Sequence, residues 1–175
     1  MMFIEYGLAS IVAANGHKRL EVGLRREGMT GLLIVLGNDR SPNETFMQVA
    51  GNGIRIAADK LRKAISQSRS LERALLNFAH AFLNQTANTA LSNGTATLEE
   101  RLARWLLMAN DRLRGNGVPL THELLSLMLG VRRAGVTVAL HYLEQRALIS
   151  LSRKEIVIMD RKGLKAAANG TYQTF

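Results

Sequence analysis

The stretch from Leu120 to Ile149, LTHELLSLMLGVRRAGVTVALHYLEQRALI, constrains the fold more than any other part of the chain. Thr121 can cap a helix whose apolar residues then recur at three- and four-residue steps. Gly130 tolerates the left-handed backbone that a tight turn needs, and Val131 begins the next segment. The pattern predicts two helices joined by a glycine turn.

The second helix of this stretch begins with arginines. Its apolar side consists of Val136, Ala139, Leu140 and Leu143. Arg132, Arg133 and Thr137 lie on or near its first exposed turns, and an arginine fork can bond guanine O6 and N7 in the DNA major groove. These three residues are therefore the predicted base contacts. An ordinary helical hairpin with a basic end fits the same stretch.

The segment that follows favours the DNA-binding interpretation. Leu148 to Ser152 and Glu155 to Met159 are short apolar runs, rich in β-branched residues and separated by Arg153-Lys154, which predicts a hairpin with a basic tip. A helix-turn-helix followed by such a hairpin is a winged helix. Thr121, Arg153 and Lys154 are the predicted phosphate contacts.

Composition agrees with a polyanionic partner. The 175 residues carry a formal net charge of +9, which would also suit a membrane surface. The basic excess lies mainly in the C-terminal half, where residues 97–175 hold 12 Lys+Arg against 7 Asp+Glu. The absence of cysteine excludes disulfides and thiolate-bound metal or iron–sulfur clusters within this chain.

The sequence shows no membrane or export signal. No apolar run approaches the roughly 20 residues that span a bilayer, and the first residues lack the pattern of a signal peptide. We expect a cytoplasmic protein without a membrane partner.

The first 56 residues alternate turn residues with short, mostly aliphatic runs, which predicts a partial antiparallel β-roll. The predicted strands are Leu8–Ala14, Arg19–Leu24, Leu32–Leu36, Thr45–Val49 and Ile54–Ile56. Gly23 interrupts the second run and indicates a bulge. Asp59 to Ser66 predicts a short helix capped by Asp59.

A long helix follows from Leu71, with two apolar stripes. The first is a heptad seam made of Leu71, Leu75, Phe78, Phe82, Gln85 and Thr89, which we assign to a homodimer interface. The second consists of Leu76, Ala79, Leu83 and Ala90. A helix this broadly apolar needs two surfaces, so we expect one stripe on the roll and one on a partner subunit. A central core helix in a monomer is the alternative.

The remaining signals complete an α+β fold in three parts: a reduced roll over 1–58, a short and a long helix over 59–94, and a winged helix over 95–175. Ser92 to Thr95 is the predicted hinge, and Thr97 with Glu100 makes a capping box for the next helix. Trp105 is expected in the core of the winged domain. A short terminal helix is expected over 160–169.

The sequence offers no catalytic or metal-binding pattern. His17, His80, His122 and His141 are scattered over separate elements, without a second ligand at metal spacing. No Ser/His/Asp set, phosphate-binding glycine loop or paired-carboxylate motif stands out. We predict neither an enzyme nor a metal site.

Taken together, these segments resemble the CRP/FNR-type bacterial transcription regulators. The resemblance rests on residues 7–13, 26–49, 99–113 and 120–149, of which the last two are the most specific. It implies a cyclic-nucleotide-binding-like roll, a dimer helix and a winged helix that binds a two-fold symmetric promoter site, with RNA polymerase as a candidate partner. Arg133 matches the family's arginine, whereas Ala134 stands where a glutamate is common and Val138 where a second arginine occurs.

The effector half departs from the family pattern. Arg40 and Ser41 match the pair that holds the cyclic phosphate and are the candidate effector residues, but Met29-Thr30 stands at the ribose-binding Gly-Glu pair. Pro42 also lacks a backbone donor. We therefore expect no cyclic nucleotide and no cofactor. Strands that precede Gly7 in the family are missing, so either the start is truncated or the roll is reduced.

The predicted function is that of a homodimeric, sequence-specific DNA-binding transcription regulator. The alternative is a shortened family member that pairs with another protein through the long helix and does not bind DNA. A small-molecule sensor whose ligand fills the reduced roll is compatible with the first of these.

Overall fold

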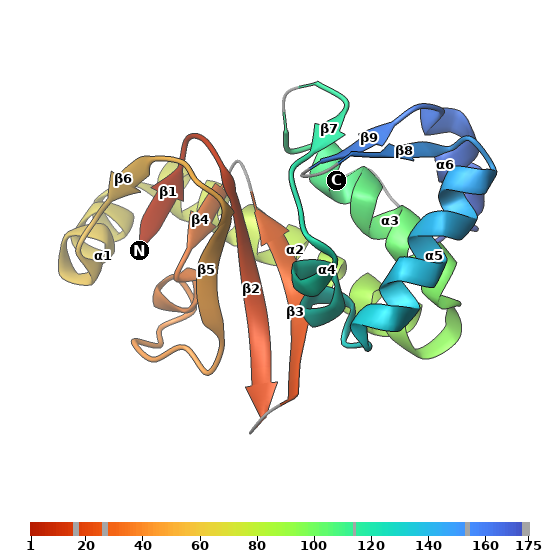
Figure 1. Ribbon diagram of the computed structural model, residues 1–175. Coiled ribbons are helices and arrows are strands. Elements are labelled where there is room, and N and C mark those ends of the chain that lie inside the picture. Colours follow the sequence, from red (N-terminus) through yellow and green to blue (C-terminus); the bar gives the residue numbers. More distant parts are fainter. Residues whose placement is uncertain (16–17, 26–27, 114, 153–154, 173–175) are drawn as a thin grey trace.

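The computed structural model describes residues 1–15, 18–25, 28–113, 115–152 and 155–172. Strands and a long helix make up the N-terminal half, and a helix-turn-helix with a small sheet makes up the C-terminal half (Figure 1). The predicted α+β fold class is confirmed.

Two antiparallel three-stranded sheets form the N-terminal roll. One has the order β4-β1-β6, from β1 (Met2–Ile4), β4 (Gly28–Thr30) and β6 (Gly53–Arg55). The other has the order β3-β2-β5, from β2 (Leu8–Asn15), β3 (Lys18–Arg25) and β5 (Glu44–Val49). The β2–β3 register shifts where Ile11 faces Gly23 and Val12 faces Glu21, so the predicted bulge at Gly23 is present.

The strand prediction for Leu32–Leu36 is wrong. Gly31 adopts a left-handed backbone (φ 77°, ψ 31°) and turns the chain into a short 3₁₀ helix, η1 (Leu32–Ile34). Leu32 is buried there against the helices that follow. The three-residue strands β1 and β4 were not predicted, because so short a run carries no readable alternation.

Two helices follow the roll. The first, α1 (Ala58–Gln67), has Ala57 at its N-cap, so the predicted cap Asp59 lies inside the first turn instead. The second, α2 (Arg69–Thr95), begins at Ser68, whose hydroxyl accepts from the Leu71 N–H at 3.3 Å. The hinge predicted at Ser92–Thr95 is wrong, because α2 stays helical through Gly94 and the Ala96 N–H still bonds the Ser92 carbonyl at 2.9 Å.

Much of the predicted interface seam of α2 lies against the chain's own roll, and so does Ala79 of the second stripe. Leu75 and Ala79 are 5 % and 3 % exposed in a cluster with Met29, Leu32 and Leu61 of the same chain. Leu71, Phe78 and Phe82 pack partly buried against this cluster. Gln85 is 1 % exposed, and Thr89 Oγ1 donates to the Gln85 carbonyl at 2.8 Å. The predicted interface seam therefore covers the chain's own roll, and Leu75 and Gln85 keep almost no surface for a partner.

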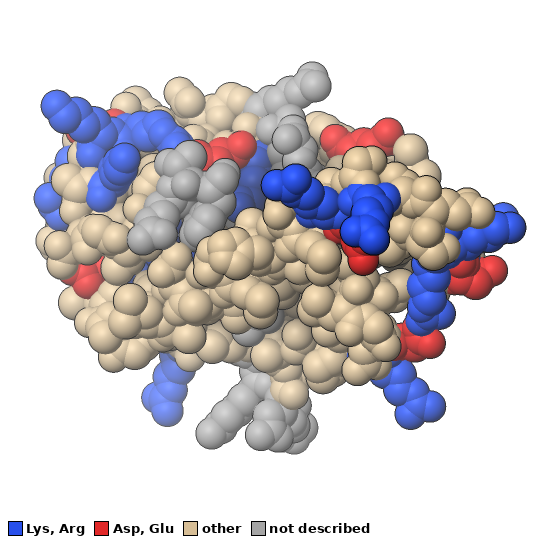
Figure 2. Space-filling model, turned by 180° about the vertical axis from the view of Figure 1, so that it is seen from behind, with Lys and Arg blue, Asp and Glu red and all other residues tan. Residues whose placement is uncertain are grey.

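The other stripe of α2 faces outward. Of its predicted members, Leu76 and Leu83 are 45 % and 59 % exposed and Ala90 is exposed as well, whereas Ala79 is buried. Leu91, next to Ala90, is 63 % exposed. No Lys, Arg, Asp or Glu occurs from residue 74 to residue 98. The face seen from behind accordingly shows a broad band without charged side chains (Figure 2).

The winged half begins with α3 (Leu98–Asn110), and the predicted capping box is confirmed, since Thr97 and Glu100 each accept a backbone N–H of the other. The helix-turn-helix is α4 (His122–Leu129) and α5 (Arg133–Gln145). The predicted hairpin is β8 (Ile149–Leu151) with β9 (Ile156–Ile158), and β7 (Gly117–Val118) adds a third strand that was not predicted. The predicted terminal helix is α6 (Arg161–Ala167).

One large core joins the winged half to the roll. Leu8 and Val12 of β2 are fully buried in the same cluster as Leu106, Leu125 and Leu140. Because the core crosses the proposed boundary near residue 95, the three-part division of the chain stays a prediction.

No single helix of the described residues is long and apolar enough to span a membrane. The pair α4 and α5 reaches the required length and composition together, but the two helices bend by 105° and their apolar faces lie in the core.

Candidate nucleic-acid interface

The turn between α4 and α5 is built by local hydrogen bonds. The Thr121 hydroxyl caps α4 by accepting from the Leu124 N–H at 3.2 Å. At the other end Gly130 is left-handed (φ 64°), and the Val131 N–H bonds the Ser126 carbonyl at 3.0 Å, which closes a Schellman turn. The bend of 105° between the helices lies in the range of DNA-binding helix-turn-helix motifs, about 90–120°.

Contacts between elements fix the angle of α5. His122 Nδ1 on α4 lies 3.1 Å from Thr137 Oγ1 on α5, and Thr137 Oγ1 also donates to the Arg133 carbonyl at 3.2 Å. The Arg101 guanidinium of α3 donates to the Leu129 carbonyl at the end of α4, where the helix dipole favours a cation. Glu144 Oε1 accepts from the Leu151 N–H at 2.9 Å and holds α5 to the wing.

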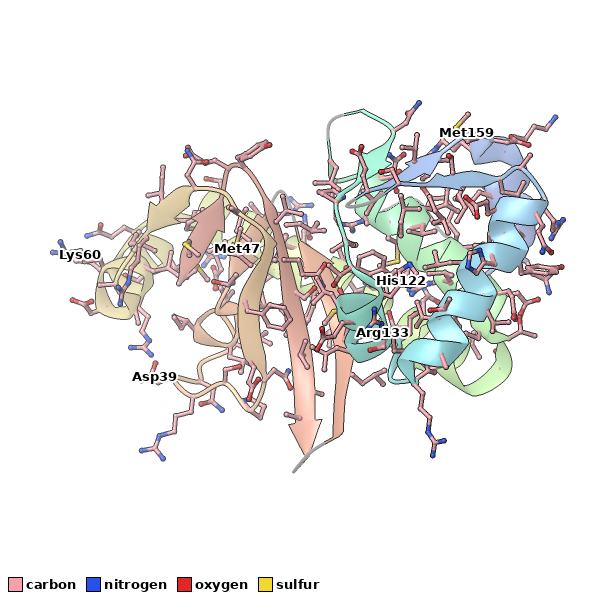
Figure 3. All side chains as sticks on the ribbon, viewed as in Figure 1. Asp39, Met47, Lys60, His122, Arg133 and Met159 are labelled. Atoms are coloured by element: carbon pink, nitrogen blue, oxygen red, sulfur yellow. The ribbon has the colours of Figure 1, made fainter. Side chains whose placement is uncertain are left out.

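The predicted base contacts Arg132 and Arg133 are both exposed where α5 begins. Arg132 is the N-cap residue in an extended conformation, and Arg133 is the first helical residue. Figure 3 labels Arg133 at the turn beside α4, with His122 close by. Both guanidinium groups can therefore reach a ligand that approaches this end of α5. Thr137 differs from them, because its hydroxyl already bonds within the motif.

The predicted phosphate contacts are only partly described. Thr121 is exposed at the N-terminus of α4, where the backbone dipole attracts anions. Arg153 and Lys154 lie outside the described residues. Arg146 is exposed at the far end of α5, with its guanidinium 5.5 Å from the ring centre of Tyr142.

A buried polar network, which the sequence did not reveal, joins the roll to this domain. Glu21 of β3 is 4 % exposed and accepts from Trp105 Nε1 of α3 and, at 3.2 Å, from the Ser10 hydroxyl of β2. Gln48 of β5 donates to Ser10 and to the sulfur of Met128 on α4. Trp105 is thus in the core as predicted, but its indole N–H faces the roll. A buried indole N–H needs a hydrogen-bond acceptor, and this requirement of Trp105 was the one sequence signal that could have pointed to Glu21.

Burial dominates the electrostatics of this network. It raises the pKa of Glu21 to about 7, although the hydrogen bonds from Trp105 and Ser10 and the charges of Arg112 and Arg104 act in the opposite direction. Burial also lowers the pKa of Arg104, whose side chain donates to the Thr171 carbonyl and to Thr89 Oγ1, both at 3.0 Å. Beside these groups lies a cavity of about 20 Å³, lined among others by Glu21, Ser92 and Arg101, which is room for about one water molecule.

The candidate effector residues do not belong to this cavity. Arg40 and Ser41 are exposed in the loop before β5, where the Ser41 hydroxyl donates to the Asn43 carbonyl at 2.9 Å. Met29 is 2 % exposed and packs on Leu32, Leu61 and Leu75. Among the described residues, no three His, Asp or Glu side chains converge as metal ligands.

The comparisons with known proteins agree with this geometry. The family description "Crp-like helix-turn-helix domain" matches residues 100–167, which contain α3, the helix-turn-helix and the β8–β9 hairpin. The chain thus contains a Crp-like helix-turn-helix domain and has the fold of CRP/FNR-type transcription regulators.

Three solved structures show the extent of the likeness. A CRP-family transcriptional regulator from Thermus thermophilus has a TM-score of 0.77 at 15 % identity, covering 98 % of this chain and 89 % of that one. A putative crp/fnr-family regulator from Eubacterium rectale has a TM-score of 0.76 at 17 % identity, with 97 % and 80 % covered. FixK2 from Bradyrhizobium japonicum has a TM-score of 0.73 at 18 % identity, with 99 % and 87 % covered. The comparison with curated protein sequences gave no significant match.

Proposed function

We propose that the protein is a homodimeric transcription regulator that binds a two-fold symmetric DNA site, with α5 in the major groove. The observation that carries this proposal is the exposed Arg132-Arg133 pair at the N-terminal end of α5, the end that reaches base edges in helix-turn-helix proteins. The Crp-like domain and the fold support it.

Each residue of the interface has a distinct proposed role. Arg133, and next to it Arg132, contact bases, because a guanidinium fork matches the two acceptors of guanine. Thr137 positions α5 against α4 through His122, so its contribution to base reading is indirect. Thr121 contacts a phosphate through its hydroxyl hydrogen. Arg153 and Lys154, which lie between β8 and β9 in the sequence, are proposed to contact other phosphates.

The proposed dimer interface is the outward stripe of α2. Leu76, Leu83 and Ala90 recur every seven residues, the spacing of a coiled-coil seam, and all three are exposed. The uncharged surface around them suits a second copy of the same helix. We propose that this dimer holds its two copies of α5 about 34 Å apart, one turn of DNA.

We further propose that the roll binds no cyclic nucleotide. The ribose-binding pair of the family is replaced by Met29, which is part of the core, and Thr30. We propose that any effector of this protein is of another chemical class. We also propose that the protein contacts RNA polymerase and is located in the cytoplasm.

The test is selection of bound duplexes from a random library at two salt concentrations. We expect a two-fold symmetric consensus and an affinity that falls with salt, because bound phosphates release counterions. On that consensus, Arg133→Ala should cost about 1–3 kcal/mol and relax the preference at one base pair per half-site, whereas Lys154→Ala should weaken all sequences alike.

A matched control is Arg55→Ala, which removes an exposed arginine from β6 in the roll, outside the proposed interface. It should leave the consensus and its affinity within twofold of the wild type. Equal losses on consensus and random duplexes for Arg133→Ala would contradict its role in base reading. A protein that forms heterodimers through α2 but enriches no sequence would favour the non-DNA-binding alternative.

A further inference from the structure

The outward face of α5 carries an apolar row where hydrogen-bonding side chains would be expected. Val136, Ala139, Leu140 and Leu143 are fully buried. Ala134 and Val138 point away from them and are exposed, and Val138 is 66 % exposed. Since they are four residues apart, the two side chains lie on one line of the helix, about 6 Å apart along its axis.

A single exposed apolar residue is ordinary on a protein surface. The position of Ala134 and Val138 on α5 must therefore show whether they have a role in binding. Ala134 follows Arg133 directly, and Val138 lies one turn farther along the surface that would enter the groove. The nearest polar candidate, Thr137, uses its hydroxyl to bond His122 and the Arg133 carbonyl. The first turns of the DNA-facing surface after Arg133 therefore present methyl groups. Tyr142, one turn beyond Val138, accepts a hydrogen bond from Arg146 through its hydroxyl.

The chemistry of the major groove narrows what such a surface can recognise. Three bases present only hydrogen-bonding groups there, which an alanine or valine side chain would leave unpaired. Thymine alone presents an apolar group, its C5-methyl. The arginines at the two ends of α5 attract the duplex. Ala134 and Val138 then have one favourable base partner, thymine.

We propose that Val138, with Ala134 beside it, selects thymine in each half-site by contact with its C5-methyl group. The inference rests on the proposed function and deepens it. Because about 6 Å of helix spans about two base-pair steps of 3.4 Å, the selected thymines lie within about two base pairs of one another and next to the pair that Arg133 reads.

The test replaces thymines of the selected consensus with deoxyuridine, which lacks only this methyl group, one position at a time, first in a single half-site and then in both. At one or two positions per half-site, the substitution in a single half-site should raise Kd about fourfold, and in both half-sites about fifteenfold. This is the effect of one buried methyl group, about 0.8 kcal/mol, at 1.4 kcal/mol per tenfold.

Two variants assign the effect to the side chain. Val138→Ala should abolish most of the deoxyuridine penalty at one position, while Val138→Thr, which keeps one γ-methyl, should retain part of it. Ile54→Ala is the matched control, because Ile54 is 61 % exposed on β6 in the roll, and it should leave the penalty unchanged.

The outcomes separate the two proposals. A consensus in which deoxyuridine changes Kd by less than 1.5-fold at every thymine, or a penalty that persists undiminished in Val138→Ala, overturns the thymine inference and leaves the proposed function standing. A library that yields no enriched sequence overturns both.

Discussion

Replacement of Glu21 by glutamine should change how the stability of the protein depends on pH. Glu21 is buried between the roll and α3, and burial raises its pKa from the ordinary 4.5 to about 7. The folded protein therefore holds this proton up to about pH 7, whereas the unfolded chain releases it near pH 4.5. Between these values the unfolded state binds fewer protons, so the free energy of unfolding falls as pH rises.

The size of the effect follows from the two pKa values. At 1.36 kcal/mol for each pH unit between 4.5 and about 7, the loss reaches about 3 kcal/mol and is complete above pH 7. Glutamine stays neutral. Its carbonyl can accept from Trp105 Nε1, and its amide can donate to the Ser10 hydroxyl, so both hydrogen bonds keep a partner. Glu21→Gln should therefore match the wild type at pH 4.5 and exceed its stability by up to about 3 kcal/mol at pH 8.

The assay is denaturant unfolding at pH 5, 6, 7 and 8, followed by the fluorescence of Trp105, the single tryptophan of the chain. Only the difference between variant and wild type is used, because other carboxylates titrate in both. Glu5→Gln, exposed after β1, is the control and should stay within about 0.5 kcal/mol of the wild type throughout. A difference for Glu21→Gln that does not change with pH, or that shrinks toward pH 8, would refute the reasoning.

The remaining predictions concern α2 and the turn of the helix-turn-helix. Leu83→Glu should shift the protein from dimer to monomer in sedimentation, whereas Leu36→Glu, at a residue 49 % exposed in the loop after η1, should not; a dimer that survives Leu83→Glu would contradict the outward stripe. Leu75→Ala should instead lower the free energy of unfolding by about 2–5 kcal/mol, because it opens a cavity in the core. Gly130→Ala should cost about 1–2 kcal/mol, measured by thermal unfolding, because its φ of 64° is strained for any residue with a Cβ.

Local signals made the helix-turn-helix predictable. These signals each act within a few residues, and all are present in the structure: the cap at Thr121, the left-handed Gly130 and the three- and four-residue periods. The capping box at Thr97 was predictable for the same reason. The fold class followed from the order of such segments.

Long-range packing was not predictable. The period of α2 shows two apolar stripes but cannot tell which neighbour covers each, so the seam through Leu75 was assigned to a partner although it covers the roll. In the sequence, Glu21 looks like an ordinary strand residue. Its partner Trp105, which donates its indole N–H, lies 84 residues away and cannot be found from local pattern. The run after Gly31 had the composition of a strand, and the left-handed glycine made it a 3₁₀ helix.

The short connection between α2 and α3 limits which DNA sites a dimer could occupy. Only Ala96 and Thr97, both extended, separate Thr95 from Leu98, and Arg104 of α3 also bonds Thr89 of α2. Because this connection is so short, the helix pair α2–α3 rather than a flexible tether would set the distance between two copies of α5 in the proposed dimer. Five additional base pairs between the half-sites would turn one of them to the opposite side of the duplex, where its copy of α5 could not follow. For the proposed dimer, the spacing of the two half-sites would therefore be as strict a requirement as their base sequence.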